Sequence, residues 1–63
     1  MNGKVKFFNR TKNFGFIVGE DDKDYFVHLS QVEGGEPLNE NDSVEFEAGS
    51  NEKGAVAEKV KRV

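Results

Sequence analysis

The chain has 63 residues, of which 33% are charged and 35% are hydrophobic, and its formal net charge is −3. This length predicts one domain, residues 1–63, with a thin core that buries about 60% of the surface of the unfolded chain. The absence of cysteine excludes a disulfide framework and a thiolate metal site. No apolar run approaches the roughly 20 residues of a membrane span, and the start has no apolar leader segment. We therefore expect a soluble, cytoplasmic protein with no membrane partner.

Charge is distributed unevenly along the sequence. Residues 1–19 carry four basic side chains and no acid, residues 20–52 carry eleven acids and one base, and residues 53–63 carry four bases and one acid. If the fold brings the two ends together, a net-negative protein can present a local positive patch. A surface of mixed charge without such a patch is the alternative.

The apolar runs are short and bounded by turn residues, which is typical of strands rather than helices. The sequence predicts strands over residues 3–9, 14–18, 25–29, 43–48 and 55–63. Turns are expected at residues 9–13, 19–24 and 49–54, and a longer connection with one helical turn at residues 30–42. The last segment has helix-favouring composition, but its valines and the turn before it favour a strand.

Hairpins between the first three strands and between the last two predict an all-β fold, a small five-stranded antiparallel barrel. Closure removes the sheet edges that a chain of this size has no other element to cover.

One face of the second and third predicted strands is aromatic. Side chains two residues apart share a face, so Phe14 lies with Phe16, and Phe26 with His28. A barrel has one interior, and it can be filled without these rings by five aliphatic residues: Val5, Ile17, Val27, Leu29 and Val44. The three phenylalanines and the histidine are then left on the outer face.

Exposed rings beside Lys6 and Lys12 suit single-stranded nucleic acid. Bases stack on aromatic faces at about 1–3 kcal/mol per base, while lysines meet phosphates. His28 can also stack and can donate or accept a hydrogen bond. We interpret Gly15 as leaving the space between Phe14 and Phe16 free. The alternative, that the rings are core and Gly15 marks a bulge, stays open from periodicity alone.

Three stretches of the sequence carry a family resemblance: "GKVKFFN", "KNFGFI" and "YFVHLS". In order and spacing they resemble the opening strand and the two ribonucleoprotein-type motifs of the cold-shock domain family. The resemblance implies an oligonucleotide-binding (OB-fold) five-stranded barrel that binds single-stranded RNA or DNA, as an RNA chaperone or a regulator of transcription or translation. Carried over by position, it implies nucleic-acid-binding roles for ten residues. The stacking residues would be Phe7, Phe14, Phe16, Phe26 and His28. The residues on the rim that faces the nucleic-acid backbone would be Lys6, Asn9 and Lys12, Asp24 would lie near the edge of a nucleobase, and Lys53 would be a basic side chain flanking the surface.

The sequence departs from the family pattern in ways that reduce stacking area. Phe7 stands where relatives usually carry Trp, Leu29 replaces a Phe, and the loop over residues 32–42 is shorter than usual and lacks an aromatic residue. Asn13 replaces a Gly, and Asn tolerates a left-handed turn. Alternation puts Phe8, and not Phe7, on the face of Lys6, so the family assignment requires a twist or bulge in the first strand. We expect micromolar or somewhat tighter binding, weaker than that of a fully aromatic member.

Other functions fit the sequence less well. One histidine, no cysteine and no nucleophile beside that histidine leave no catalytic group, so we expect no enzyme. The acids at Asp21, Asp22 and Asp24 lack calcium-loop spacing. We expect a monomer without metal or small-molecule cofactor. The remaining alternative is a β-barrel interaction module that binds an extended peptide on the same aromatic face. The lysines argue against it.

Overall fold

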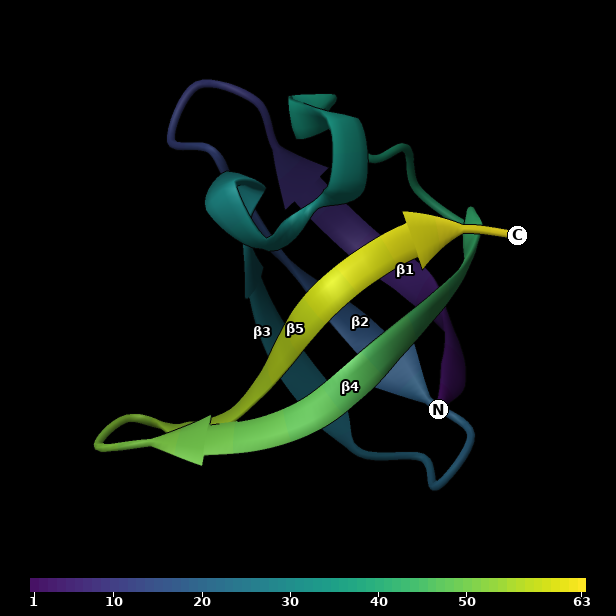
Figure 1. Cartoon of the computed structure of the whole chain (residues 1–63), viewed down its shortest axis with the longest axis vertical. Coiled ribbons are helices and arrows are strands. Elements are labelled where there is room, and N and C mark those ends of the chain that lie inside the picture. The colour runs from purple at the N-terminus through teal and green to yellow at the C-terminus, as the bar shows by residue number, and fades with distance from the viewer.

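The computed structural model describes residues 1–63 as a closed five-stranded barrel (Figure 1). The connection between the third and fourth strands holds two 3-10 helices. The strands and helices are β1 (Asn2–Asn9), β2 (Phe14–Gly19), β3 (Asp24–His28), η1 (Leu29–Gln31), η2 (Glu33–Gly35), β4 (Ser43–Asn51) and β5 (Gly54–Arg62). No helix in the structure has the length and apolar character that crossing a membrane requires.

Around the barrel the strands follow the order β1-β2-β3-β5-β4. Four neighbouring pairs are antiparallel, and β3 lies parallel to β5 through a single pairing of Phe26 with Val56. An odd number of strands that alternate in direction cannot close with every pair antiparallel. The five-stranded all-β barrel is therefore confirmed, with one parallel seam that the sequence prediction lacked.

The predicted strands all form, with boundaries that differ by one residue at six ends and by three residues at the end of β4. Residues 49–51, predicted as a turn, extend β4, because Asn51 pairs with Gly54 across a tighter hairpin. This hairpin projects beyond the rest of the barrel (Figure 1). Leu29, predicted to end the third strand, begins η1 instead.

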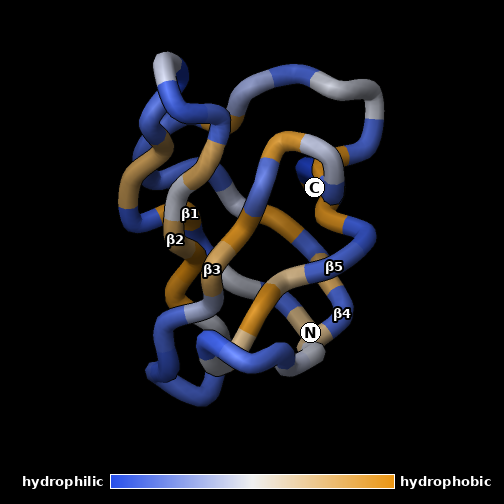
Figure 2. The backbone as a smooth tube through the Cα atoms, turned by 90° about the vertical axis from the view of Figure 1, so that its left-hand side faces the viewer, coloured by the Kyte–Doolittle hydropathy of each residue, from blue (hydrophilic) through white to orange (hydrophobic).

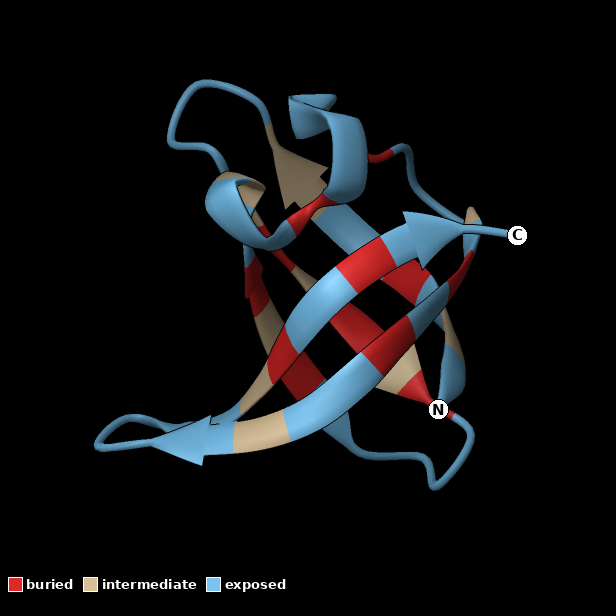
Figure 3. Ribbon diagram, in the orientation of Figure 1, coloured by how far each residue is buried: buried red, intermediate tan, exposed pale blue.

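The core lies inside the barrel, and half-buried or exposed positions separate the buried residues along the strands (Figure 3). The hydropathy colouring likewise concentrates apolar residues on strands and polar residues on the hairpin loops (Figure 2). Two residues of the long connection, Val32 and Leu38, are also buried. The ten core residues are Val5, Ile17, Tyr25, Val27, Val32, Leu38, Val44, Phe46, Ala57 and Val60.

The aliphatic interior predicted from the sequence is confirmed at four of its five positions, and Leu29 is half-buried against the core. The interior also takes two rings, Tyr25 and Phe46, whose centroids are 5.1 Å apart. Ala48, which shares the parity of Phe46, is exposed instead.

A β-bulge in β1 changes the parity of the strand. Val5 pairs with Ile17, but the next pair is Phe7 with Phe16, so Lys6 is an extra residue on β1. A bulge of this kind turns the following side chains to the opposite face. Phe7 therefore points outward and Phe8 packs against the core. The bulge that the family assignment requires is present.

Gly15 has a different role from the one predicted. It is buried, and a Cβ there would lie 2.7 Å from Cα and 2.9 Å from Cδ2 of Phe8. The missing side chain thus lets β1 approach β2 with Phe8 packed over it. It does not open space between Phe14 and Phe16, which lie on the other face.

Replacing Gly15 with alanine should lower the free energy of unfolding by about 1–3 kcal/mol, because the added methyl would push against the β1 backbone. Gly49→Ala is the matched control, since its Cβ would meet only the flexible carboxylate of Glu58, and its effect should stay within about 0.5 kcal/mol. Urea unfolding of both variants measures the difference. Equal losses would contradict this account of Gly15.

A hydrogen bond from a buried tyrosine fixes the β2–β3 hairpin. The Tyr25 hydroxyl donates to Oδ2 of Asp21 at 2.6 Å, and the backbone N–H of Lys23 donates to Oδ1 at 3.2 Å. The tyrosine hydrogen bond lowers the pKa of the Asp21 carboxyl, and backbone N–H donors lower it further. The same bond raises the pKa of Tyr25.

This lowered pKa predicts a pH-dependent contribution to stability. It is fully present above the ordinary carboxyl pKa of about 3.9 and disappears as the pH falls through the lower folded value. Tyr25→Phe removes the donor, so the variant should lose less stability than the unsubstituted protein on acidification below about pH 4. Thermal unfolding over a pH series tests this. A stability difference between the two proteins that stays constant across that range would contradict it.

Candidate nucleic-acid interface

Four phenylalanines form a continuous row on the outer face of β1, β2 and β3. The ring centroids of Phe7 and Phe16 are 5.5 Å apart, those of Phe16 and Phe26 are 5.8 Å apart, and those of Phe26 and Phe14 are 5.5 Å apart. Neighbouring rings are tilted or edge-on to each other, at interplanar angles of 48°, 75° and 31°. We call Phe7, Phe14, Phe16 and Phe26 the aromatic row.

The strand registers explain why these rings meet. Phe7 lies opposite Phe16, Phe16 opposite Phe26, and Phe14 opposite His28. Side chains directly opposite on one face are close neighbours. The aromatic row and His28 therefore occupy adjacent positions on three strands, although they come from three separate stretches of the sequence.

None of the four rings belongs to the core. Phe14, Phe16 and Phe26 are half-buried, and Phe7 is 39% exposed. His28 is exposed. A cluster of accessible rings on one face is typical of a binding surface. The interpretation of the phenylalanines as ordinary core residues is therefore wrong.

Two charged residues predicted at the site are paired with each other. Nζ of Lys6, the bulged residue, lies 3.3 Å from Oδ2 of Asp24. Each side chain is about half exposed, at 54% and 53%, so the pair is screened by water and contributes little to stability. The ammonium of Lys6 is partly neutralised in the free protein.

The turn between β1 and β2 is organised by Asn9. Its side-chain oxygen accepts hydrogen bonds from the backbone N–H groups of Thr11 and Lys12, at 2.9 and 3.0 Å. Asn13 adopts the left-handed conformation with φ of 63°, as its replacement of a glycine implied. Asn9 thus shapes the turn that holds Lys12 between β1 and β2. Lys12 is exposed and has no ion-pair partner in the structure.

The β4–β5 hairpin brings Lys53 to the aromatic row. A groove beside the row is lined by Phe16, Asp24, Phe26, Asn51, Glu52, Lys53, Ala55 and Val56. A neighbouring groove is lined by Phe26, His28, Ser30, Gln31, Asn51, Val56, Ala57 and Glu58. The sequence prediction missed the polar members Asn51, Ser30 and Gln31, which lie in or next to turns and carry no strand periodicity.

The basic side chains at the C-terminus pair with acids instead of joining the N-terminal ones. Lys59 lies 3.8 Å from a carboxylate oxygen of Glu47, and Lys61 lies 3.3 Å from one of Glu45. Arg62 contacts Glu36 and Asp42, each at 3.5 Å, so it ties β5 to the β3–β4 connection. Of the four basic residues at positions 53–63, Lys53 is the one that lines a groove beside the aromatic row.

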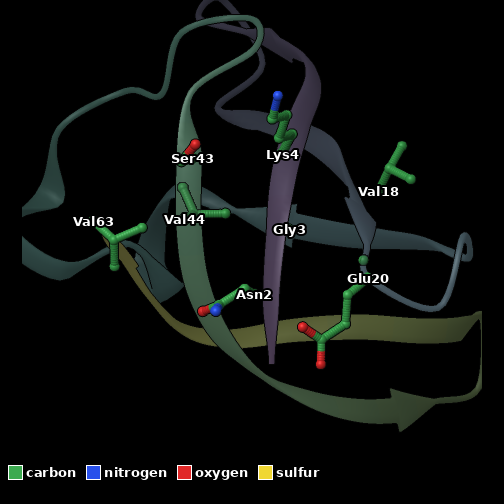
Figure 4. A pocket seen from close by; sticks show the side chains of 9 residues that line it. Asn2, Gly3, Lys4, Val18, Glu20, Ser43, Val44 and Val63 are labelled. Carbon is green, nitrogen blue, oxygen red and sulfur yellow. The ribbon is translucent and has the colours of Figure 1, made fainter.

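Figure 4 shows a further hollow, which no residue of the aromatic row lines. Its charged members are one base, Lys4, and one acid, Glu20, so it has no excess positive charge. None of the predicted binding residues lines it. Its lining residues are Asn2, Gly3, Lys4, Val18, Gly19, Glu20, Ser43, Val44 and Val63.

Known proteins share both the sequence and the fold. The sequence model of the "Cold-shock" DNA-binding domain matches residues 1–63. The chain belongs to the cold-shock domain family. It is 48% identical over 63 residues to the cold shock-like protein CspLB of Listeria monocytogenes, which covers 97% of this chain and 96% of the relative. It is 46% identical over 61 residues to cold shock protein 1 of Lactiplantibacillus plantarum, which covers 94% and 92% of the two chains.

A solved structure of Drosophila Unr CSD456 superposes with a TM-score of 0.76 at 26% identity. It covers 98% of this cold-shock domain, which spans 26% of that longer chain. These matches confirm the resemblance drawn from the sequence motifs and the OB-fold class of the barrel. Cold shock proteins are nucleic-acid-binding proteins without enzymatic activity, which agrees with the expectation that this chain is not an enzyme.

Proposed function

We propose that this cold-shock domain binds single-stranded RNA or DNA by stacking bases on the aromatic row. The observation that carries the proposal is the unbroken contact of Phe7, Phe16, Phe26 and Phe14 on an accessible face. Every base has a π-face, so stacking on these rings tolerates any sequence. In a duplex both faces of each base are already stacked, and the domain therefore selects single strands.

The basic side chains at the rim support this choice of ligand. Lys53 lines a groove beside the row, and Lys12 lies two residues before Phe14 in the β1–β2 turn. Neither has an ion-pair partner in the structure, while Lys6 shares its charge with Asp24. Two to three phosphates can therefore be neutralised along a bound strand. A peptide-binding face has no general need for these lysines, although a peptide that competes with an oligonucleotide would favour the interaction-module alternative.

The biological role that follows is that of an RNA chaperone or a regulator of transcription or translation. Binding through stacking is transient and weakly selective, which suits a protein that keeps many transcripts single-stranded. Phe7 has a smaller ring than the Trp usual in the family, so the affinity should be micromolar or somewhat tighter. We propose that the domain acts in the cytoplasm, in keeping with its lack of cysteine. We also propose that it acts as a monomer.

Removing rings from the row should weaken binding while the fold persists. Stacking contributes about 1–3 kcal/mol per base, so Phe14→Ala and Phe26→Ala should each lower the affinity for an oligopyrimidine strand by about fivefold or more. Tyr25→Phe is the control, because its ring lies in the interior. Titration of each folded variant, checked by circular dichroism, measures the loss. Unchanged affinity in both alanine variants would overturn the stacking model.

Binding should depend only mildly on salt. With two to three phosphates neutralised, the slope of log K against log salt should be about −1.4 to −2.1 for a single strand. Lys12→Gln and Lys53→Gln should each reduce that slope by about 0.7.

Lys59→Gln provides the matched control for this series, since Lys59 pairs with Glu47 away from the aromatic row. It should leave the slope unchanged. The same reduction in all three variants would show that the charge effect is general and that Lys12 and Lys53 do not contact the strand.

A further inference from the structure

His28 is held by a short hydrogen-bonded turn that distinguishes its two ring nitrogens. Its backbone is extended, with φ of −104° and ψ of 149°, and its side chain caps the start of η1. The backbone N–H of Ser30 donates to Nδ1 of His28 at 3.1 Å, and Oγ of Ser30 lies 3.0 Å from the same nitrogen. Since an amide N–H acts only as a donor, Nδ1 must accept and therefore carries the lone pair.

The hydrogen of the neutral imidazole consequently lies on Nε2. The Ser30 hydroxyl can then donate to Nδ1 as well, which reinforces the same tautomer. His28 is exposed, and Nε2 has no hydrogen-bond partner within the protein. The turn thus leaves one N–H donor of fixed position available on the aromatic face.

The surroundings of this donor place it beside the stacking surface. His28 lies opposite Phe14 in the β2–β3 pairing. It also lines a groove together with Phe26 and Val56. A base stacked on Phe14 or Phe26 would turn its edge toward this groove, where the other polar groups are those of Ser30, Gln31, Asn51 and Glu58.

We propose that Ser30 is a positioning residue that holds His28 as an Nε2–H donor, and that this N–H reads an acceptor on the edge of a stacked base. The inference rests on the proposed function. Keto oxygens, as in thymine, uracil and guanine, are the acceptors that suit a fixed donor. An exocyclic amino group at the same place is itself a donor. It would face the Nε2–H of His28 and leave both donors without an acceptor, which is unfavourable.

The first test uses the free protein and needs no ligand. Imidazole nitrogen signals of His28, recorded by long-range proton–nitrogen NMR at mildly alkaline pH, should show a protonated Nε2 and an unprotonated Nδ1. In Ser30→Ala one donor to Nδ1 is lost, so the other tautomer should gain population, and Ser30→Thr should restore the original signals. A protonated Nδ1 in the unsubstituted protein, or identical signals in Ser30→Ala, would overturn the role of Ser30.

The second test measures the contact with the base. Two strands are compared, oligothymidine and its difluorotoluene isostere, which stacks but accepts hydrogen bonds weakly. A single hydrogen bond predicts that the preference for thymine falls by about fivefold in His28→Asn. Asparagine is favoured at helix N-caps, so it should keep the cap of η1. Its side chain is too short to reach the position of Nε2. Ser30→Ala should lower the preference in the same direction, and Ser30→Thr should restore it.

The outcomes separate the two proposals. An unchanged thymine preference in His28→Asn, with binding retained, would overturn the base-edge contact while stacking stands. Failure of the unsubstituted protein to bind either strand would overturn that contact together with the proposed function, whereas the tautomer assigned in the free protein would still stand on its own measurement.

Discussion

The bulge at Lys6 is the constraint on which the aromatic row depends. One extra residue in β1 turns Phe7 outward to meet Phe16 and turns Phe8 inward over Gly15. Without it, strict alternation would bury Phe7 and expose Phe8, and Phe7 would no longer lie opposite Phe16. The bulge needs Gly15 on the facing strand, because any side chain there would collide with β1. The backbone geometry of the β1–β2 pair therefore determines which ring of β1 joins the aromatic row.

The distribution of charge follows from the same barrel. The β4–β5 hairpin places β5 beside β4, and the acids of β4 and of the β3–β4 connection neutralise Lys59, Lys61 and Arg62. The bases that remain without acidic partners near the aromatic row lie in the β1–β2 and β4–β5 hairpins. A protein with net charge of −3 can in this way keep a few cations at the edge of a stacking surface. Under the proposed function, long-range attraction of the phosphate chain is then weak, and the proposed contacts act mainly at short range.

The sequence predicts the strands, the aromatic face and the family, because period-two alternation and motif spacing are local signals. Strict alternation puts Phe8 on the face of Lys6, whereas the family pattern assigns stacking to Phe7, so the sequence also predicts a bulge in β1. Other features depend on contacts between distant segments. The role of Gly15 is set by Phe8 across the β1–β2 pairing. The pairing of the C-terminal bases depends on β4–β5 register, which no short window of sequence encodes.

The central claim is that single strands bind on the face formed by the aromatic row and His28. Amide chemical-shift mapping tests it most directly, with a single-stranded oligonucleotide and the duplex of the same sequence as ligands. The account predicts large shifts at Phe7, Phe14, Phe16, Phe26 and His28 with the single strand and small ones with the duplex. Shifts concentrated around the hollow between Lys4 and Ser43, or equal shifts with both ligands, would contradict it.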